Sequence, residues 1–139
     1  MMRSTTACLA ALFAVFALEW RSAVVSAECI VVRATLEQRV AGSQLVFVAD
    51  VLGFENILKP ESYQYRVRFR VIEAYRGIEA GERAVQFRPT AEDFVFKVPQ
   101  RVLVYASGTR DNYSTQCTAT RVVTLEDPEI EELRRLVGK

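Results

Sequence analysis

Few residues in this chain could carry acid–base or metal chemistry, because its 139 residues include no histidine. Histidine is the commonest general base and metal ligand, so histidine-dependent triads and most catalytic zinc sites are excluded. The remaining candidates are the carboxylate pair Glu92–Asp93 and the acidic cluster Glu126–Glu132. The acidic cluster also suits the positive end of a helix dipole. The glycines are scattered singly, without a phosphate loop or a dinucleotide fingerprint. We therefore expect no catalysis, no cofactor and no metal site.

The N-terminus predicts export. A basic residue precedes the unbroken apolar run Ala7–Leu18, and the small residues Ser26–Ala27 follow, a pattern typical of a secretory signal peptide. The run is too short to cross a bilayer, which takes about 20 apolar residues. We expect cleavage before Glu28, which removes residues 1–27. Residues 28–139 then form a single exported domain, extracellular or periplasmic, without a membrane span.

Cys29 and Cys117 are the cysteines that remain after cleavage, near the two ends of the exported domain. In an oxidising compartment they are expected to form a disulfide, with two buried free thiols as the alternative. Such a bridge would stabilise the fold by about 4–5 kcal/mol in the chain-entropy account, and it would remove thiol catalysis. The same cleavage leaves equal numbers of basic and acidic residues, so no net charge attracts nucleic acid.

A stripe of arginines, Arg66, Arg68 and Arg70, alternates with apolar residues over Tyr63–Val71. This alternation predicts a long, half-buried strand with the arginines on its outer face. Such a face can bind oligosaccharides or single-stranded nucleic acid. A solvated face paired with acidic residues across strands is the simpler interpretation for a domain of zero net charge.

The elements that position these residues are mainly β. Apolar or alternating runs predict five strands: Leu45–Leu52, Tyr63–Val71, Ala84–Arg88, Arg101–Ser107 and Gln116–Leu125. The first two are separated by an expected loop over Phe54–Glu61, and Asp111–Asn112 marks a turn. At Val71–Ile72 the alternation slips by one residue, which predicts a β-bulge.

Two helices flank the strands. Thr35 and Gln38 form a capping-box pattern for a helix over Leu36–Ala41 that ends at Gly42. A second helix is predicted near the C-terminus, with Asp127 as its N-cap, Pro128 as its first helical residue and Gly138 as its end. Three of its apolar residues fall on one face: Ile130, Leu133 and Val137. The sequence thus predicts a mainly β fold, a five-stranded OB-fold-like barrel with a short N-terminal helix and a C-terminal helix packed on it.

The order of several segments resembles a known family. Cys29, the runs Leu45–Leu52 and Tyr65–Gly77, the strand Val102–Ala106 and Cys117 follow one another as in the netrin-like domain of tissue inhibitors of metalloproteinases and their bacterial relatives. The resemblance covers nearly the whole exported part. It implies a five-stranded OB barrel with flanking helices.

The resemblance also indicates what this chain lacks. In such inhibitors the domain begins Cys-x-Cys, and the first cysteine chelates the zinc of the protease through its amine and carbonyl. Cys29 is similar to the second of these cysteines and Cys117 to its disulfide partner. The position of the first cysteine falls on Ala27, which the signal peptidase should remove, and the loop Thr90–Glu92 has no cysteine to bond to it. The chelating group is therefore absent.

The resemblance still implies a contact ridge built from three segments. Its candidate residues are Glu28, Cys29, Ile30 and Val31, then Thr90, Ala91 and Glu92, then Tyr113, Ser114 and Thr115. We expect a non-catalytic module that binds another exported or surface protein there, a metalloprotease being one candidate. The alternatives are an inhibitor with an altered N-terminal edge, an ordinary N-terminal strand stapled to the barrel, and an oligosaccharide- or nucleic-acid-binding barrel that uses Arg66, Arg68 and Arg70.

Overall fold

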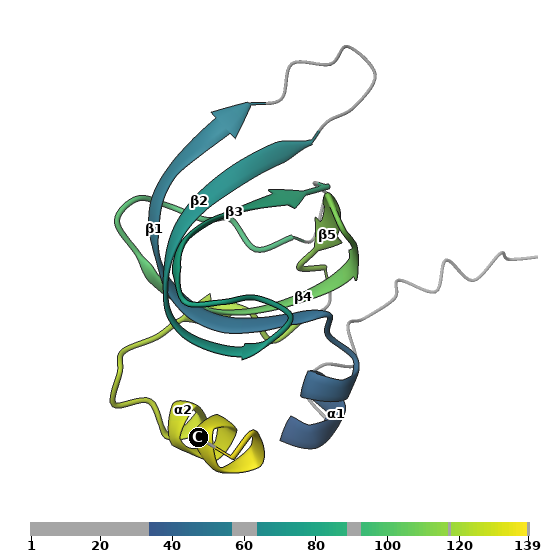
Figure 1. The fold of residues 1–139 in the computed structure, drawn as a ribbon, viewed down its shortest axis with the longest axis vertical. Coiled ribbons are helices and arrows are strands. Elements are labelled where there is room, and N and C mark those ends of the chain that lie inside the picture. Colours follow the sequence, from purple (N-terminus) through teal and green to yellow (C-terminus); the bar gives the residue numbers. More distant parts are fainter. Residues whose placement is uncertain (1–33, 57–63, 89–92, 117, 139) are drawn as a thin grey trace, which may run out of the picture.

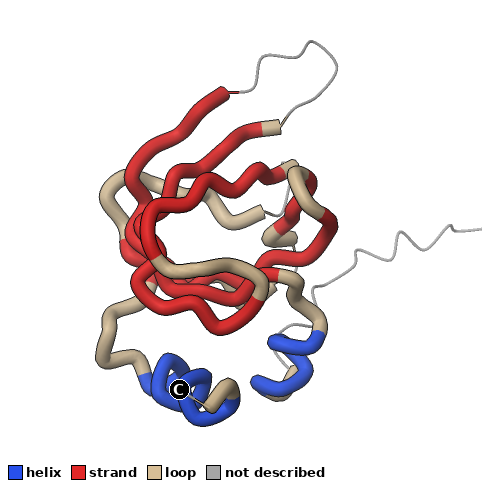
Figure 2. The backbone as a smooth tube through the Cα atoms, viewed as in Figure 1, coloured by secondary structure: helices blue, strands red, loops and turns tan. Residues whose placement is uncertain are grey.

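The computed structural model describes residues 34–56, 64–88, 93–116 and 118–138. In chain order its elements are α1 (Leu36–Ala41), β1 (Leu45–Asn56), β2 (Tyr65–Arg76), β3 (Gly81–Phe87), β4 (Arg101–Thr109), β5 (Asn112–Ser114), β6 (Arg121–Val122) and α2 (Pro128–Leu136). The strands wrap around one another, and both helices lie at one side of them (Figures 1 and 2).

The sheet closes on itself. The hydrogen-bonded order is β1-β2-β3-β5-β4, and β4 returns to pair with β1, from Leu45 opposite Ala106 to Asp50 opposite Arg101. All of these pairs are antiparallel except β3 with β5, and β6 adds a short pairing on β4. The predicted five-stranded, OB-fold-like barrel with two flanking helices is confirmed.

β1 is buried on both faces, as its continuous apolar run predicts. Alternate residues, among them Phe47, join an inner cluster that fills the barrel, whereas Val46 and Val48 join an outer cluster. Inside, Phe69 makes edge-to-face contacts with Phe47 and Phe96, with ring centroids 5.2 and 5.4 Å apart. The outer cluster packs against Ile130 and Leu133 of α2, which cover this side of the barrel.

Both helices begin at the caps that the sequence predicts. At α1 the Gln38 amide donates to the Thr35 hydroxyl over 3.2 Å, and the Thr35 amide donates to the Gln38 side chain over 3.0 Å. At α2 the Glu129 amide donates to the Asp127 carboxylate over 3.0 Å. These reciprocal bonds satisfy amides that a helix leaves without partners.

The predicted bulge in β2 is present. Val48 lies opposite Glu73 and Ala49 opposite Val71, so Ile72 has no opposite residue in β1. Further register shifts occur next to Leu52 and Tyr75, which the alternation pattern does not indicate. Bulges increase local twist, as closing a small barrel requires.

Several predicted boundaries are wrong: β3 starts at Gly81 rather than Ala84, and β4 continues to Thr109. The two largest errors lie elsewhere. β1 continues through Phe54 to Asn56, so the predicted loop starts too early, and its remainder lies outside the described residues. The predicted strand Gln116–Leu125 is also wrong, because β5 ends at Ser114 and only the two residues of β6 pair with β4 in that stretch.

Threonine hydroxyls explain the second error. The Thr118 hydroxyl donates to the Thr115 carbonyl over 2.8 Å, and the Thr120 hydroxyl both accepts from the Tyr105 amide and donates to its carbonyl, each over 3.0 Å. These bonds replace a backbone ladder, which β-branched residues otherwise favour. Within the described ranges, no helix is long and apolar enough to cross a membrane.

Candidate functional site

The described part of the predicted ridge lies where β3 meets β5. Phe87, the last residue of β3, lies opposite Tyr113 in the parallel pairing, and the Arg88 amide donates to the Tyr113 carbonyl over 2.8 Å. The Tyr113 side chain packs partly against the inner cluster. The end of β3 and the end of β5 therefore reach the same edge of the barrel.

A small hydrogen-bond network fixes this edge. The Ser114 hydroxyl donates to the Asp93 carboxylate over 3.2 Å, and the Thr115 hydroxyl lies 3.4 Å from the same oxygen. The Phe94 amide donates to the Thr115 hydroxyl over 3.0 Å. We call Asp93, Ser114 and Thr115 the polar edge. It joins the segment after β3 to the end of β5.

Local backbone geometry places Ser114 and Thr115 at this edge. β4 and β5 form a hairpin whose turn contains Asp111 at φ 63° and is preceded by Gly108 at φ 122°. A Cβ added to Gly108 would lie 2.4 Å from the Asn112 carbonyl oxygen, so only glycine fits there. The turn thereby fixes the pairing of Ser107 with Ser114.

The edge is polar on one side and aromatic on the other. Tyr65 of β2 stacks on Phe87 with ring centroids 5.7 Å apart. Burial, with a smaller contribution from the Asp93 carboxylate, raises the pKa of Tyr65 to about 12. A tyrosine is protonated at neutral pH in any case, and this shift moves its titration further away, so the Tyr65 hydroxyl can act as a donor.

The ridge residues differ in exposure. Tyr113 and Ser114 are partly exposed, whereas Thr115 is only 3 % exposed and both of its hydroxyl interactions are internal. Thr115 thus positions its neighbours. The other candidates, at 28–31 and 90–92, lie outside the described residues, as do both cysteines of the predicted disulfide, Cys29 and Cys117.

The arginine stripe lies on the outer face of β2, as predicted. Arg66 lies 3.4 Å from the Glu55 carboxylate, and Arg70 lies 3.8 Å from that of Glu82. Arg68 extends across Gly53, where an added Cβ would come 3.1 Å from its Nη2. Acidic neighbours on β1 and β3 thus offset part of the positive charge.

Several of the carboxylates considered for catalysis have structural partners. Asp93 belongs to the polar edge, and Asp127 accepts two hydrogen bonds from Arg121, at 2.6 and 2.8 Å, which lower the pKa of its carboxyl. Glu131 pairs with Arg134 at 3.1 Å. Over residues 34–56, 64–88, 93–116 and 118–138, no cluster of three or more candidate metal ligands occurs.

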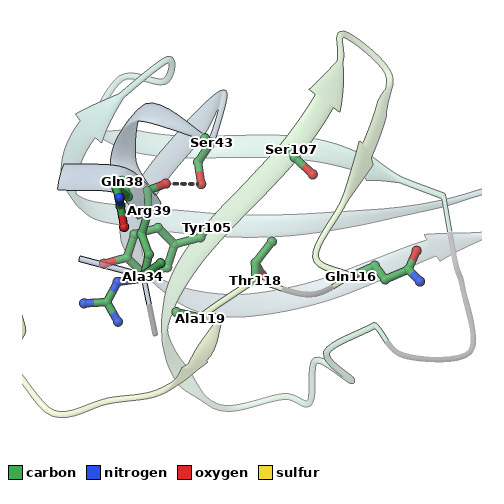
Figure 3. A pocket seen from close by; sticks show the side chains of 10 residues that line it. Ala34, Gln38, Arg39, Ser43, Tyr105, Ser107, Gln116, Thr118 and Ala119 are labelled. Carbon is green, nitrogen blue, oxygen red and sulfur yellow. Dashed lines mark hydrogen bonds between the residues drawn. The ribbon is translucent and has the colours of Figure 1, made fainter. Parts of the chain in front are cut away.

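A second feature lies beside the polar edge and is not indicated by the sequence pattern. A pocket of about 210 Å³ separates α1 from β4 and from the residues that follow β5. Its walls are Ala34, Gln38, Arg39, Gly42, Ser43, Tyr105, Ser107, Gln116, Thr118 and Ala119. Figure 3 shows the Arg39 side chain beside the Tyr105 ring, with the Ser43 hydroxyl bonded to the Arg39 carbonyl over 2.8 Å.

Arg39 links the two helices across this side of the barrel. Its guanidinium lies over the Tyr105 ring, 5.9 Å from the centroid, and forms an ion pair with Glu129 of α2. Burial, followed by the Glu129 charge, raises the pKa of Tyr105. No local sequence pattern marks this pair, because the two residues are far apart along the chain.

Comparison with known protein families found no match, and comparison with curated proteins found none. The fold and the contacts above are therefore the basis for assigning a function.

Proposed function

We propose that this chain is an exported, netrin-like module without catalytic activity that binds another exported or surface protein. The contact surface in this proposal comprises the segments 28–31 and 90–92 together with Tyr113 and Ser114. The barrel supports the proposal, because the resemblance implies a five-stranded OB barrel with flanking helices and the structure has this architecture.

One observation carries the proposal. The network of Asp93, Phe94, Ser114 and Thr115 ties the segment after β3 to the end of β5. Asp93 directly follows Thr90–Glu92 in the sequence. The residue that follows the candidate segment 90–92 is therefore tied to the end of β5. This link supports a contact surface that uses both segments.

Affinity capture with matched variants tests the proposal. The purified exported domain is immobilised and exposed to the exported proteins of its source. We expect a protein that is retained by the parent domain and by Arg68→Ala, a change on the outer face of β2 outside the proposed surface, but lost with Glu92→Arg and with Tyr113→Ala. Circular dichroism checks that each variant is folded. Equal retention by all four proteins would refute the proposed edge.

Export and the disulfide belong to the same proposal. Intact mass of the secreted protein should show a chain that starts at Glu28 and is two hydrogens lighter than its reduced form. A titration that finds two free thiols would contradict the Cys29–Cys117 bridge, and a retained N-terminus would contradict cleavage.

Metalloproteinase inhibition is not part of the proposal, because the chelating cysteine is missing. A chain that begins at Glu28 would have to order its first residues on binding, at about 1–2 kcal/mol per residue. We expect no inhibition of zinc metalloproteinases at micromolar concentration. A nanomolar inhibition constant that acetylation of the N-terminal amine abolishes would instead assign the chelating role to Glu28.

Binding of polyanions at the arginine stripe is the rival function. The ion pairs of Arg66 and Arg70 argue against it, since a polyanion would have to displace Glu55 and Glu82. Binding of heparin or single-stranded DNA at low salt, abolished when Arg66, Arg68 and Arg70 are all replaced by alanine without unfolding, would favour the rival.

A further inference from the structure

α1 is attached to the barrel by little apolar contact. None of its residues is buried, and only Leu36 and Val40 pack partly against the outer cluster. A helix of six residues does not hold together on its own in water. Its position therefore depends largely on polar contacts.

Arg39 supplies the main polar contact of α1 with the rest of the protein. Its guanidinium is clamped between the Tyr105 ring on β4 and the Glu129 carboxylate on α2. The Glu129 side chain is only 12 % exposed, and it also lies 3.3 Å from Arg121, which itself binds Asp127, the N-cap of α2. The acceptor for Arg39 is therefore held in place by an independent set of bonds.

α1 is not packed tightly where it faces β4 and the residues that follow β5. The 210 Å³ pocket lies between α1 and the residues Gln116, Thr118 and Ala119, which come directly after the polar edge. At the C-terminal end of the helix, Arg76 donates a 2.6 Å hydrogen bond to the Val40 carbonyl. A helix with few apolar contacts and a gap beside its clamp can shift when the clamp is released.

The Arg39 guanidinium in this clamp does not use all of its hydrogen-bond donors. The Nε group of Arg39 is buried and has no hydrogen-bond partner among the described residues. A buried donor without an acceptor opposes the docked position of the side chain. The ion pair with Glu129 must therefore outweigh this opposition for α1 to stay docked.

We propose that the Arg39–Glu129 pair is a latch that holds α1 against the barrel and so fixes the position of α1 relative to the Tyr113–Thr115 end of the contact surface. Arg39 and Glu129 are positioning residues, because neither belongs to the contact surface. The role in binding rests on the proposed function, whereas the latch itself does not. Partner affinity at the edge then depends on a carboxylate carried by the C-terminal helix.

Hydrogen–deuterium exchange of the full exported domain tests the latch without any partner. Glu129→Gln should raise the exchange of amides over residues 36–43 at least tenfold and leave β4 residues 101–106 unchanged. Glu132→Gln, an exposed change on the same helix, should alter neither segment. Unchanged exchange over 36–43 in Glu129→Gln, or an equal rise in β4, would overturn the latch.

A double-mutant cycle removes the ambiguity that Glu129 also contacts Arg121. The cycle compares Arg39→Gln, Glu129→Gln and the double variant. Adding the second substitution to the first should raise the amide exchange rate over residues 36–43 by less than a further threefold. Full additivity would mean that the two residues act separately and would overturn the proposal.

Binding is measured with whatever protein the parent domain captures. Glu129→Gln should weaken that binding about tenfold, and Glu132→Gln should not. If exchange responds as expected but no partner is captured, the latch stands and the proposed function fails. If a partner binds both variants equally, the coupling of α1 to the edge is refuted.

Discussion

Phe94 and Thr115 are joined by a 3.0 Å hydrogen bond from the amide of the first to the hydroxyl of the second, across 21 positions of sequence. Thr115→Val keeps the shape of the side chain but leaves the Phe94 amide without this acceptor. We expect a loss of about 1–3 kcal/mol in the free energy of unfolding, the cost of an unsatisfied buried donor. Urea denaturation measures it.

The control is Thr124→Val. This substitution makes the same chemical change at an exposed residue outside the polar edge. Its effect should stay within about 0.5 kcal/mol. Equal losses in the two variants would show that the Thr115 hydroxyl does not tie the edge together.

The β4–β5 turn should tolerate no side chain at Gly108. Gly108→Ala combines an unfavourable φ of 122° with a contact of 2.4 Å to the Asn112 carbonyl oxygen. Gly81→Ala has a similar φ, 103°, but no atom within 4 Å of the added Cβ. We expect Gly81→Ala to cost about 1–3 kcal/mol through backbone strain alone, and Gly108→Ala to cost more. Thermal unfolding compares them, and an equal or smaller loss for Gly108→Ala would show that the clash is relieved cheaply.

Phe69 should be among the most costly residues to truncate. It is fully buried and its ring contacts those of Phe47, Phe87 and Phe96. Phe69→Ala should destabilise the domain by about 3–5 kcal/mol, as expected when an aromatic side chain leaves a packed core. Arg68→Ala, on the outer face of the same strand, should cost less than about 1 kcal/mol. Similar losses in the two variants would contradict an inward-facing Phe69 and an outward-facing Arg68 on β2.

Stability should fall in acid, in a way that depends on Asp127. Hydrogen bonds from Arg121 lower the pKa of the Asp127 carboxyl, and those from Arg101 lower that of Asp50. Between the lowered folded value and the unfolded value of about 3.9, the unfolded chain binds more protons, so stability rises with pH. The contribution is complete above about pH 5 and is lost as the pH falls through the folded pKa.

Asp127→Asn keeps an N-cap side chain but removes the charge, so the melting temperature should change less steeply between about pH 5 and pH 2. Asp111→Asn, at the exposed β4–β5 turn, controls for the loss of one negative charge. An unchanged slope in Asp127→Asn would mean that its pairing with Arg121 contributes nothing to acid sensitivity.

The elements that could be predicted from sequence are those whose signals are local. The capping box at Thr35 and Gln38, and Asp127 followed by Pro128, locate both helices because the residues that satisfy the end amides lie within one turn. The alternation around Phe69 is a local signal too. It predicts that Phe69 points inward, because neighbouring side chains on a strand face opposite sides.

The rest depends on contacts between distant residues. β5 has only three residues and no period of its own, and its pairing with the end of β3 follows from the turn at Gly108 and Asp111. Thr118 and Thr120 fit a strand by composition, yet their hydroxyls bind the backbone instead. Arg39 and Glu129 lie near the two ends of the described sequence, so no local stretch of sequence contains both.

Closure of the barrel imposes an order of events on the growing chain. β1 acquires β2 as a neighbour soon after synthesis, but its other edge is completed only by β4, whose pairing runs from Asp50 with Arg101 to Leu45 with Ala106. Contacts between residues so far apart form late, because a long loop must close first. The last seam of the barrel therefore cannot form until most of the domain has been made.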